Sequence, residues 1–187
     1  VMFGLNLKKD LTNEQREQIA EKYIKMVGLE KFMDAYPKEL SGGMKRKLML
    51  CRALLTEPEI LILDEPTIGL DPASRRQMWD LLKSLNRQGM TILLTTHYID
   101  EAQYLCQRIA LIEQGKVARL DTPDALIREL GEVAIDEFDG DHTKSAFFPD
   151  KESALQYASS LDNRFMLRNT TLEDVFLNVV GHGLGGK

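Results

Sequence analysis

The stretch ILILDEP occupies residues 60–66 and decides the fold class. Its four consecutive apolar residues, Ile60 to Leu63, are bounded by turn signals. That pattern is typical of a strand covered on both faces, as in a parallel sheet. Two carboxylates, Asp64 and Glu65, follow at the carboxyl end of this strand. In open α/β sheets ligands bind outside the carboxyl ends of the strands, so the stretch predicts a site as well as a strand.

Helix and strand patterns alternate on both sides of this stretch. A capping box at Thr12 and Gln15 begins one helix, and the apolar period of residues 44–55 predicts a second. Asp71-Pro72 begins a third helix, which leads to a second strand at residues 91–95. Together they predict a layered α/β domain. The later predicted elements are helices at 99–106, 122–131, 153–161 and 171–180, strands at 109–112, 117–120, 133–138 and 164–167, and a frayed tail at 181–187.

Length and charge narrow the class of protein. The 187 residues suit one domain with a small appendage, and the net charge of -5 argues against a nucleic-acid partner. No run reaches the ~20 apolar residues of a membrane span, and no secretory leader is expected. The two cysteines, Cys51 and Cys106, are far apart within helix-like patterns, so we expect free thiols.

The segment LSGGM, residues 40–44, is a candidate anion site. Ser41 stands at a helix N-cap, and Gly42 and Gly43 leave backbone N–H groups open to close approach. Three cations follow at residues 45–47, where they oppose the helix dipole, so stability alone does not favour them. The alternative is an ordinary helix cap with a solvated basic face, and for an isolated glycine motif that alternative is favoured.

Two carboxylates and a histidine are candidates for chemistry at the edge of the sheet. In nucleotide hydrolases with a P-loop, an aspartate placed like Asp64 helps to hold Mg²⁺. The neighbouring Glu65 could orient and deprotonate a water molecule. His97 follows the second strand and so lies at the same sheet edge. The alternatives are a polar strand end for the carboxylates and a structural role for His97. Taken by itself, Asp71 in the segment GLDP is typical of a helix cap.

The order of these motifs is more specific than any one of them. The series LSGGM, strand-DE, GLDP and strand-TTH resembles the nucleotide-binding domain of ATP-binding-cassette (ABC) transporters over about residues 1–131. The segments LSGGMKRKL, LLTTHYIDEAQYLC and TLEDVFL resemble those of the exporter branch of the family, which handles drugs, polysaccharides and lipids. Met44 and Ile68 depart from the residues that the family often has at these positions.

The resemblance implies a role for each matching residue. Glu65 would polarise the attacking water, His97 would contact the γ-phosphate of ATP, and Asp64 would support Mg²⁺. The signature segment would bind ATP held mainly by a second subunit, and the D-loop aspartate would lie at the dimer interface. The implied nucleotide-binding residues are Ser41, Gly42, Gly43 and Asp71.

One family motif is missing from the 187 residues. Nothing before Leu40 has the phosphate-cradling spacing G-x-x-x-x-G-K-[ST], the Walker A motif. The run from Gly181 to Lys187 has the glycine–lysine spacing, but it follows a helix pattern and lacks the Ser/Thr. We therefore expect the C-terminal part of a longer domain, inactive by itself, with an exposed sheet edge.

The implied fold is an α/β P-loop NTPase core with three layers and a mainly parallel sheet. We expect part of a helical subdomain at 1–57, the C-terminal part of the core at 58–131, and a small α+β appendage at 132–187. The implied function is MgATP hydrolysis coupled to export, with a permease and a second ATP-binding domain as partners, at the cytoplasmic face of the membrane. Two alternatives stay open, namely a soluble ABC protein of translation or DNA repair, and a remnant that does not hydrolyse ATP.

Overall fold

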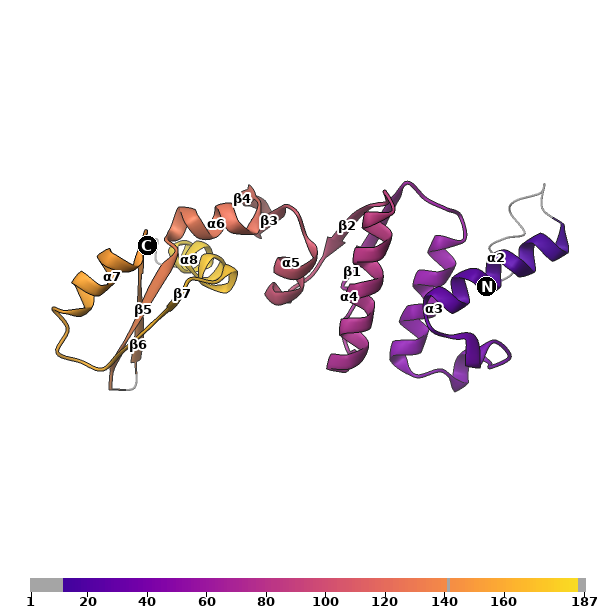
Figure 1. Cartoon of the computed structure of the whole chain (residues 1–187), viewed down its shortest axis with the longest axis horizontal. Coiled ribbons are helices and arrows are strands. Elements are labelled where there is room, and N and C mark those ends of the chain that lie inside the picture. Colours follow the sequence, from indigo (N-terminus) through magenta and orange to yellow (C-terminus); the bar gives the residue numbers. More distant parts are fainter. Residues whose placement is uncertain (1–11, 141, 185–187) are drawn as a thin grey trace. The chain divides into compact units, whose positions relative to one another are not determined.

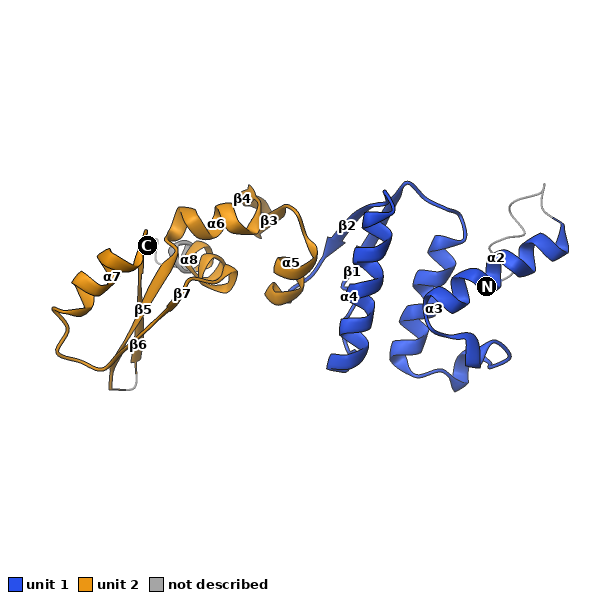
Figure 2. Ribbon diagram, viewed as in Figure 1, with its two compact units in different colours: residues 1–97 blue, residues 98–187 orange. Residues whose placement is uncertain are grey.

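The computed structural model describes residues 12–140 and 142–184 and divides the chain into two compact units (Figures 1 and 2). The first unit comprises residues 1–97 and the second comprises residues 98–187. Every site residue that the sequence predicts belongs to the first unit. The finer division at residues 57 and 131 stays a proposal.

The described part of the first unit begins with two helices, α2 and α3, that pack against each other (Figure 1). Helix α2 spans Asn13–Met26, and its capping box at Thr12 and Gln15 is confirmed. Two short 3-10 turns follow, η1 at Glu30–Phe32 and η2 at Pro37–Glu39. Helix α3 then spans Gly42–Leu54 with Ser41 as its N-cap, so the LSGGM segment forms the start of a helix as expected.

The predicted strand–helix–strand series follows. Strand β1 spans Ile60–Asp64, helix α4 spans Pro72–Arg87, and strand β2 spans Thr91–Thr95. The two strands pair in parallel, from Ile60 opposite Thr91 to Asp64 opposite Thr95. The predicted α/β alternation is thus confirmed, and the parallel register brings the carboxyl ends of both strands to one edge.

The prediction that β1 is covered on both faces is wrong for the described residues. Leu61 is buried, but Ile60 is 60% exposed and Ile62 is 71% exposed, and Leu93 on β2 is 60% exposed. Helix α4 packs against β2, whereas no described element covers these three side chains. A continuous apolar run indicates a strand whose two faces are both suited to burial. It does not indicate whether this chain supplies the elements that cover both faces.

The second unit begins with helix α5, Ile99–Leu105, and a hairpin. Strand β3, Ile109–Glu113, pairs antiparallel with β4, Lys116–Asp121. The predicted turn is confirmed, because Gln114 and Gly115 both have positive φ values, 48° and 75°, as a two-residue hairpin turn requires. Helix α6 spans Pro123–Leu130 and ends at Gly131.

The remaining elements form an antiparallel sheet with two helices. Strands β5, Val133–Asp139, β6, His142–Phe148, and β7, Phe165–Asn169, have the order β6-β5-β7. Helix α7 spans Lys151–Ala158 and α8 spans Leu172–Leu184. Strand β6 was not predicted. The predicted frayed tail is wrong as far as Leu184, which is helical, and residues 185–187 lie outside the described part.

Two apolar clusters hold the second unit together. One joins β3, α6 and α8 through Ile109, Leu126, Leu172 and their neighbours, and the other joins β5 to α7.

Cys51 and Cys106 are free thiols, and burial raises the pKa of both. Within the described residues, none of the helices combines the length and the apolar character that a membrane span needs.

Candidate functional site

The parallel register places Asp64, Glu65 and His97 at one edge of the β1–β2 pair. Asp64 ends β1, Glu65 follows it, and His97 comes two residues after the end of β2. Nδ1 of His97 lies 2.8 Å from Oε2 of Glu65. Since a carboxylate accepts hydrogen bonds, the imidazole N–H is the donor. The structure therefore brings Glu65 and His97 together, as the sequence predicts. The Glu65 side chain is 30% exposed.

Asp64 has a different partner from Glu65. The hydroxyl of Thr95, directly opposite on β2, donates to the Asp64 carboxylate. This bond orients one oxygen of an exposed carboxylate at the strand end. The adjacent carboxylates thus point to different partners, as a division of roles between metal support and proton transfer requires.

The glycine segment forms the first turn of α3. The Ser41 hydroxyl accepts a hydrogen bond from the Met44 backbone N–H at 3.2 Å, so it caps the helix. Gly43 lies against Leu70, whose Cδ2 would be 3.1 Å from a Cβ placed on that glycine. The start of α3 therefore packs against the loop between β1 and α4, while Gly42 has open space around it.

Asp71 is the N-cap of α4. Its Oδ1 accepts the Ser74 backbone N–H at 2.9 Å. Hydrogen bonds from the side chain and then the backbone of Ser74 hold the pKa of this carboxyl below its ordinary value. The structure thus supports the capping role that the sequence offered as the alternative, and a role at a dimer interface stays a proposal.

The residues present fit a magnesium ion that arrives with a nucleotide. Across residues 12–140 and 142–184, no cluster of three His, Cys, Asp or Glu side chains could hold a metal ion by itself. Mg²⁺ is commonly bound through one or two carboxylates together with substrate phosphates. The exposed Asp64 carboxylate meets that requirement, and the phosphates would supply the other oxygens.

Two further residues contact the site, and sequence reasoning did not assign them a role there. Thr95 was predicted as part of a strand, and its place opposite Asp64 follows from the matching strand lengths. Arg46 was noted only as one of three basic residues. Its guanidinium donates to the Glu65 backbone carbonyl at 2.9 Å, a contact across 19 positions that no local pattern indicates.

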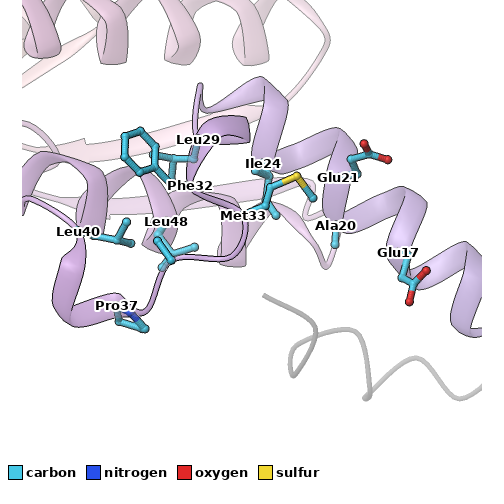
Figure 3. A pocket seen from close by; sticks show the side chains of 11 residues that line it. Glu17, Ala20, Glu21, Ile24, Leu29, Phe32, Met33, Pro37, Leu40 and Leu48 are labelled. Carbon is cyan, nitrogen blue, oxygen red and sulfur yellow. The ribbon is translucent and has the colours of Figure 1, made fainter.

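A separate cavity of about 680 Å³ lies among α2, the 3-10 turns and α3 (Figure 3). Its wall is mainly apolar, with Ala20 and Ile24 from α2 and Leu48 from α3, and Glu17 and Glu21 also border it. Of the LSGGM residues only the first, Leu40, contributes to this wall. The residues predicted for the site are absent from its lining.

Sequence comparisons agree with the motif order. The profile of the ABC transporter family matches residues 3–68. The Nod factor export ATP-binding protein I of Rhizobium meliloti (strain 1021) is 40% identical, over 93% of this chain and 58% of that protein. The protein of that name from Paraburkholderia xenovorans (strain LB400) is also 40% identical, over 82% of this chain and 57% of that protein. The chain thus spans somewhat more than half the length of these curated relatives.

Solved structures give the same result. A dimeric post-hydrolysis state of the ATP-binding cassette MJ0796 bound to ADP and Pi is similar at 34% identity and a TM-score of 0.55, over 60% of this chain and 49% of that one. The cbiO1 protein of Clostridium perfringens, part of the ABC transporter complex cbiONQ, is similar at 30% identity and a TM-score of 0.62, over 68% and 51%. The P-loop NTPase fold class is confirmed, and this chain is similar in sequence and fold to ATP-binding proteins of the ABC transporter family.

Proposed function

We propose that this chain is part of an ATP-binding and ATP-hydrolysing subunit of an ABC transporter that exports its substrate. The observation that carries this proposal is the 2.8 Å contact between His97 Nδ1 and Glu65 Oε2 beside the Asp64 carboxylate. A positioned carboxylate at the carboxyl end of a parallel strand is suited to take a proton from water.

The residues have distinct proposed roles. Glu65 accepts the proton of the attacking water, and His97 orients the accepting carboxylate through its Nδ1–H. Asp64, held by Thr95, would be a ligand of Mg²⁺, which neutralises phosphate charge when bound. The start of α3, at Ser41, Gly42 and Gly43, offers backbone N–H groups and a positive dipole end to a phosphate.

The proposed partners are a second ATP-binding domain and a membrane-embedded permease, at the cytoplasmic face of the membrane. The names of similar proteins support these partners: the curated relatives are named export ATP-binding proteins, one similar structure is a dimer, and another belongs to a transporter complex. These names favour a transporter over a soluble ABC protein. The Glu65–His97 contact favours hydrolysis over a remnant that only binds ATP.

The test is the substitution Glu65→Gln in the protein that contains this chain at its natural length. The amide keeps the shape and removes the base, so ATP binding should survive while the hydrolysis rate falls by at least about 10²-fold. Glu59→Gln is the matched control, because it makes the same change at the opposite, exposed end of β1 and should leave the rate unchanged. Wild-type turnover in Glu65→Gln would contradict the proposed base.

A further inference from the structure

Glu65 has a backbone conformation that its surroundings must hold in place. Its φ is +49°, in the left-handed region that residues other than Gly, Asn and Asp rarely adopt. Its N–H donates to the Thr95 carbonyl at 3.1 Å, which ties it to β2. Its own carbonyl accepts two hydrogen bonds, from the Ile68 N–H at 3.3 Å and from Arg46 Nη1 at 2.9 Å.

Arg46 makes the shorter of these two bonds, and it does so from another element. It is half-buried on α3 near the Ser41 cap, where a cation is not favoured by the helix dipole. A charged donor makes a stronger hydrogen bond than a neutral one, so Arg46 restrains the Glu65 carbonyl more strongly than the Ile68 N–H does. The direction of a carbonyl fixes the peptide plane, and the peptide plane constrains the direction of the Glu65 side chain.

A second contact joins the same two segments. Gly43, in the first turn of α3, lies against Leu70 in the loop that follows Glu65. Leu70 is buried, and a Cβ on Gly43 would be 3.1 Å from its methyl group. The start of α3 and the loop that carries Glu65 are thus held together by one polar and one apolar contact.

We propose that Arg46 is a positioning residue, which holds the left-handed backbone of Glu65 so that its carboxylate stays aligned with His97. The same bond makes the orientation of Glu65 depend on the position of the α3 N-terminus. A phosphate bound at Ser41 to Gly43 would therefore influence the alignment of the base. This inference rests on the proposed function, since it concerns the residue proposed to take the proton.

The experiment compares three variants of the protein at its natural length. Arg46→Met should lower kcat by about tenfold to a hundredfold, because small displacements of a catalytic group have effects of that size, while the Kd for ATP stays unchanged. Arg46→Lys keeps a charged donor and should recover most of the rate. Arg52→Met removes an exposed arginine from the last turn of the same helix and should behave as wild type.

A double-mutant cycle distinguishes positioning from general damage. In a Glu65→Gln background, Arg46→Met should cause no further fall in kcat, because Arg46 acts through Glu65. Independent losses in the two variants, or a full rate in Arg46→Met when the wild type is active, would overturn the role of Arg46 alone. A wild-type protein that binds ATP but does not hydrolyse it would overturn the proposed function and this role with it.

Discussion

At the scale of single residues, Glu65 occupies a position that another residue would fill at lower cost. In the left-handed region the Cβ of an L-residue crowds the following carbonyl oxygen, at about 1–2 kcal/mol. Gln114 has nearly the same φ, but there the hairpin turn requires a positive value. After β1 a glycine or an asparagine would be less strained. The proposed base therefore has a strained backbone conformation, and its carboxylate accepts a hydrogen bond from His97.

Ser41 separates the capping role of its segment from the proposed nucleotide role. Its hydroxyl caps α3 through the Met44 N–H, so Ser41→Ala should lower the free energy of unfolding by about 1 kcal/mol. Ser41→Arg places a large charged side chain at the exposed start of α3, so we expect it to block hydrolysis while ATP still binds. The measurements are denaturant unfolding, ATP titration and phosphate release. Normal turnover in Ser41→Arg would leave the segment with its capping role only.

At the scale of elements, local signals predicted most of the structure. Caps and apolar periods predicted α2, α4 and α6, because each is set within a few residues of its own sequence. Strand β6 escaped prediction, since its polar first half has no apolar alternation and its pairing with β5 fixes it. The Glu65–His97 contact could be predicted from the parallel register, whereas the Arg46 contact depends on how α3 packs.

Asp136 shows how tertiary contacts change the meaning of a charged stretch. Asp136, Glu137 and Asp139 lie close together in the sequence, and the structure places Asp136 on β5 with both its oxygens bonded to Arg168 on β7. Arg168 also binds both oxygens of Asp174 on α8, at 2.7 and 2.9 Å. One arginine thus fastens α8 to the sheet. Burial alone would raise the pKa of both aspartates. Their hydrogen bonds have the larger total effect, so the pKa of each aspartate lies below its ordinary value.

This cluster predicts a pH-dependent loss of stability in Arg168→Met. At neutral pH the variant leaves two buried carboxylates facing each other, so unfolding should become easier by about 3 kcal/mol, the low end for buried ion pairs. Carboxyls with lowered pKa values stabilise the fold above their ordinary pKa and lose that contribution as the pH falls. The difference between wild type and variant should therefore shrink towards pH ~3.

Chemical unfolding at several pH values measures the effect, and Arg164→Met is the matched control. Arg164 is an exposed arginine just before β7, so its loss should change stability by less than about 0.5 kcal/mol. A difference between wild type and Arg168→Met that stays constant with pH would show that the aspartates do not contribute as charged groups.

At the scale of the whole molecule, both units leave some large apolar side chains of their described residues exposed, such as Ile62 at 71% in the first unit and Ile112 at 64% in the second. The second unit closes two clusters around its own sheet and hairpin. The first unit leaves Ile60, Ile62 and Leu93 exposed on one face of the β1–β2 pair. Three large apolar side chains on one sheet face form a surface that favours association. The proposed catalytic edge therefore belongs to a pair of strands with one apolar face that the described residues leave uncovered.

The last prediction concerns nucleotide binding by the 187-residue chain alone. For binding a phosphate, its described residues provide the N-terminus of α3 and the Asp64 carboxylate, which could hold a cation, and its sequence holds no G-x-x-x-x-G-K-[ST] loop. Backbone N–H groups of such a loop supply most of the phosphate contacts in P-loop proteins. Calorimetry with Mg-ATP should therefore give a Kd much weaker than micromolar, whereas the protein at its natural length should bind tightly. Micromolar affinity in the 187-residue chain would mean that Ser41 to Gly43 and Asp64 suffice to hold the triphosphate.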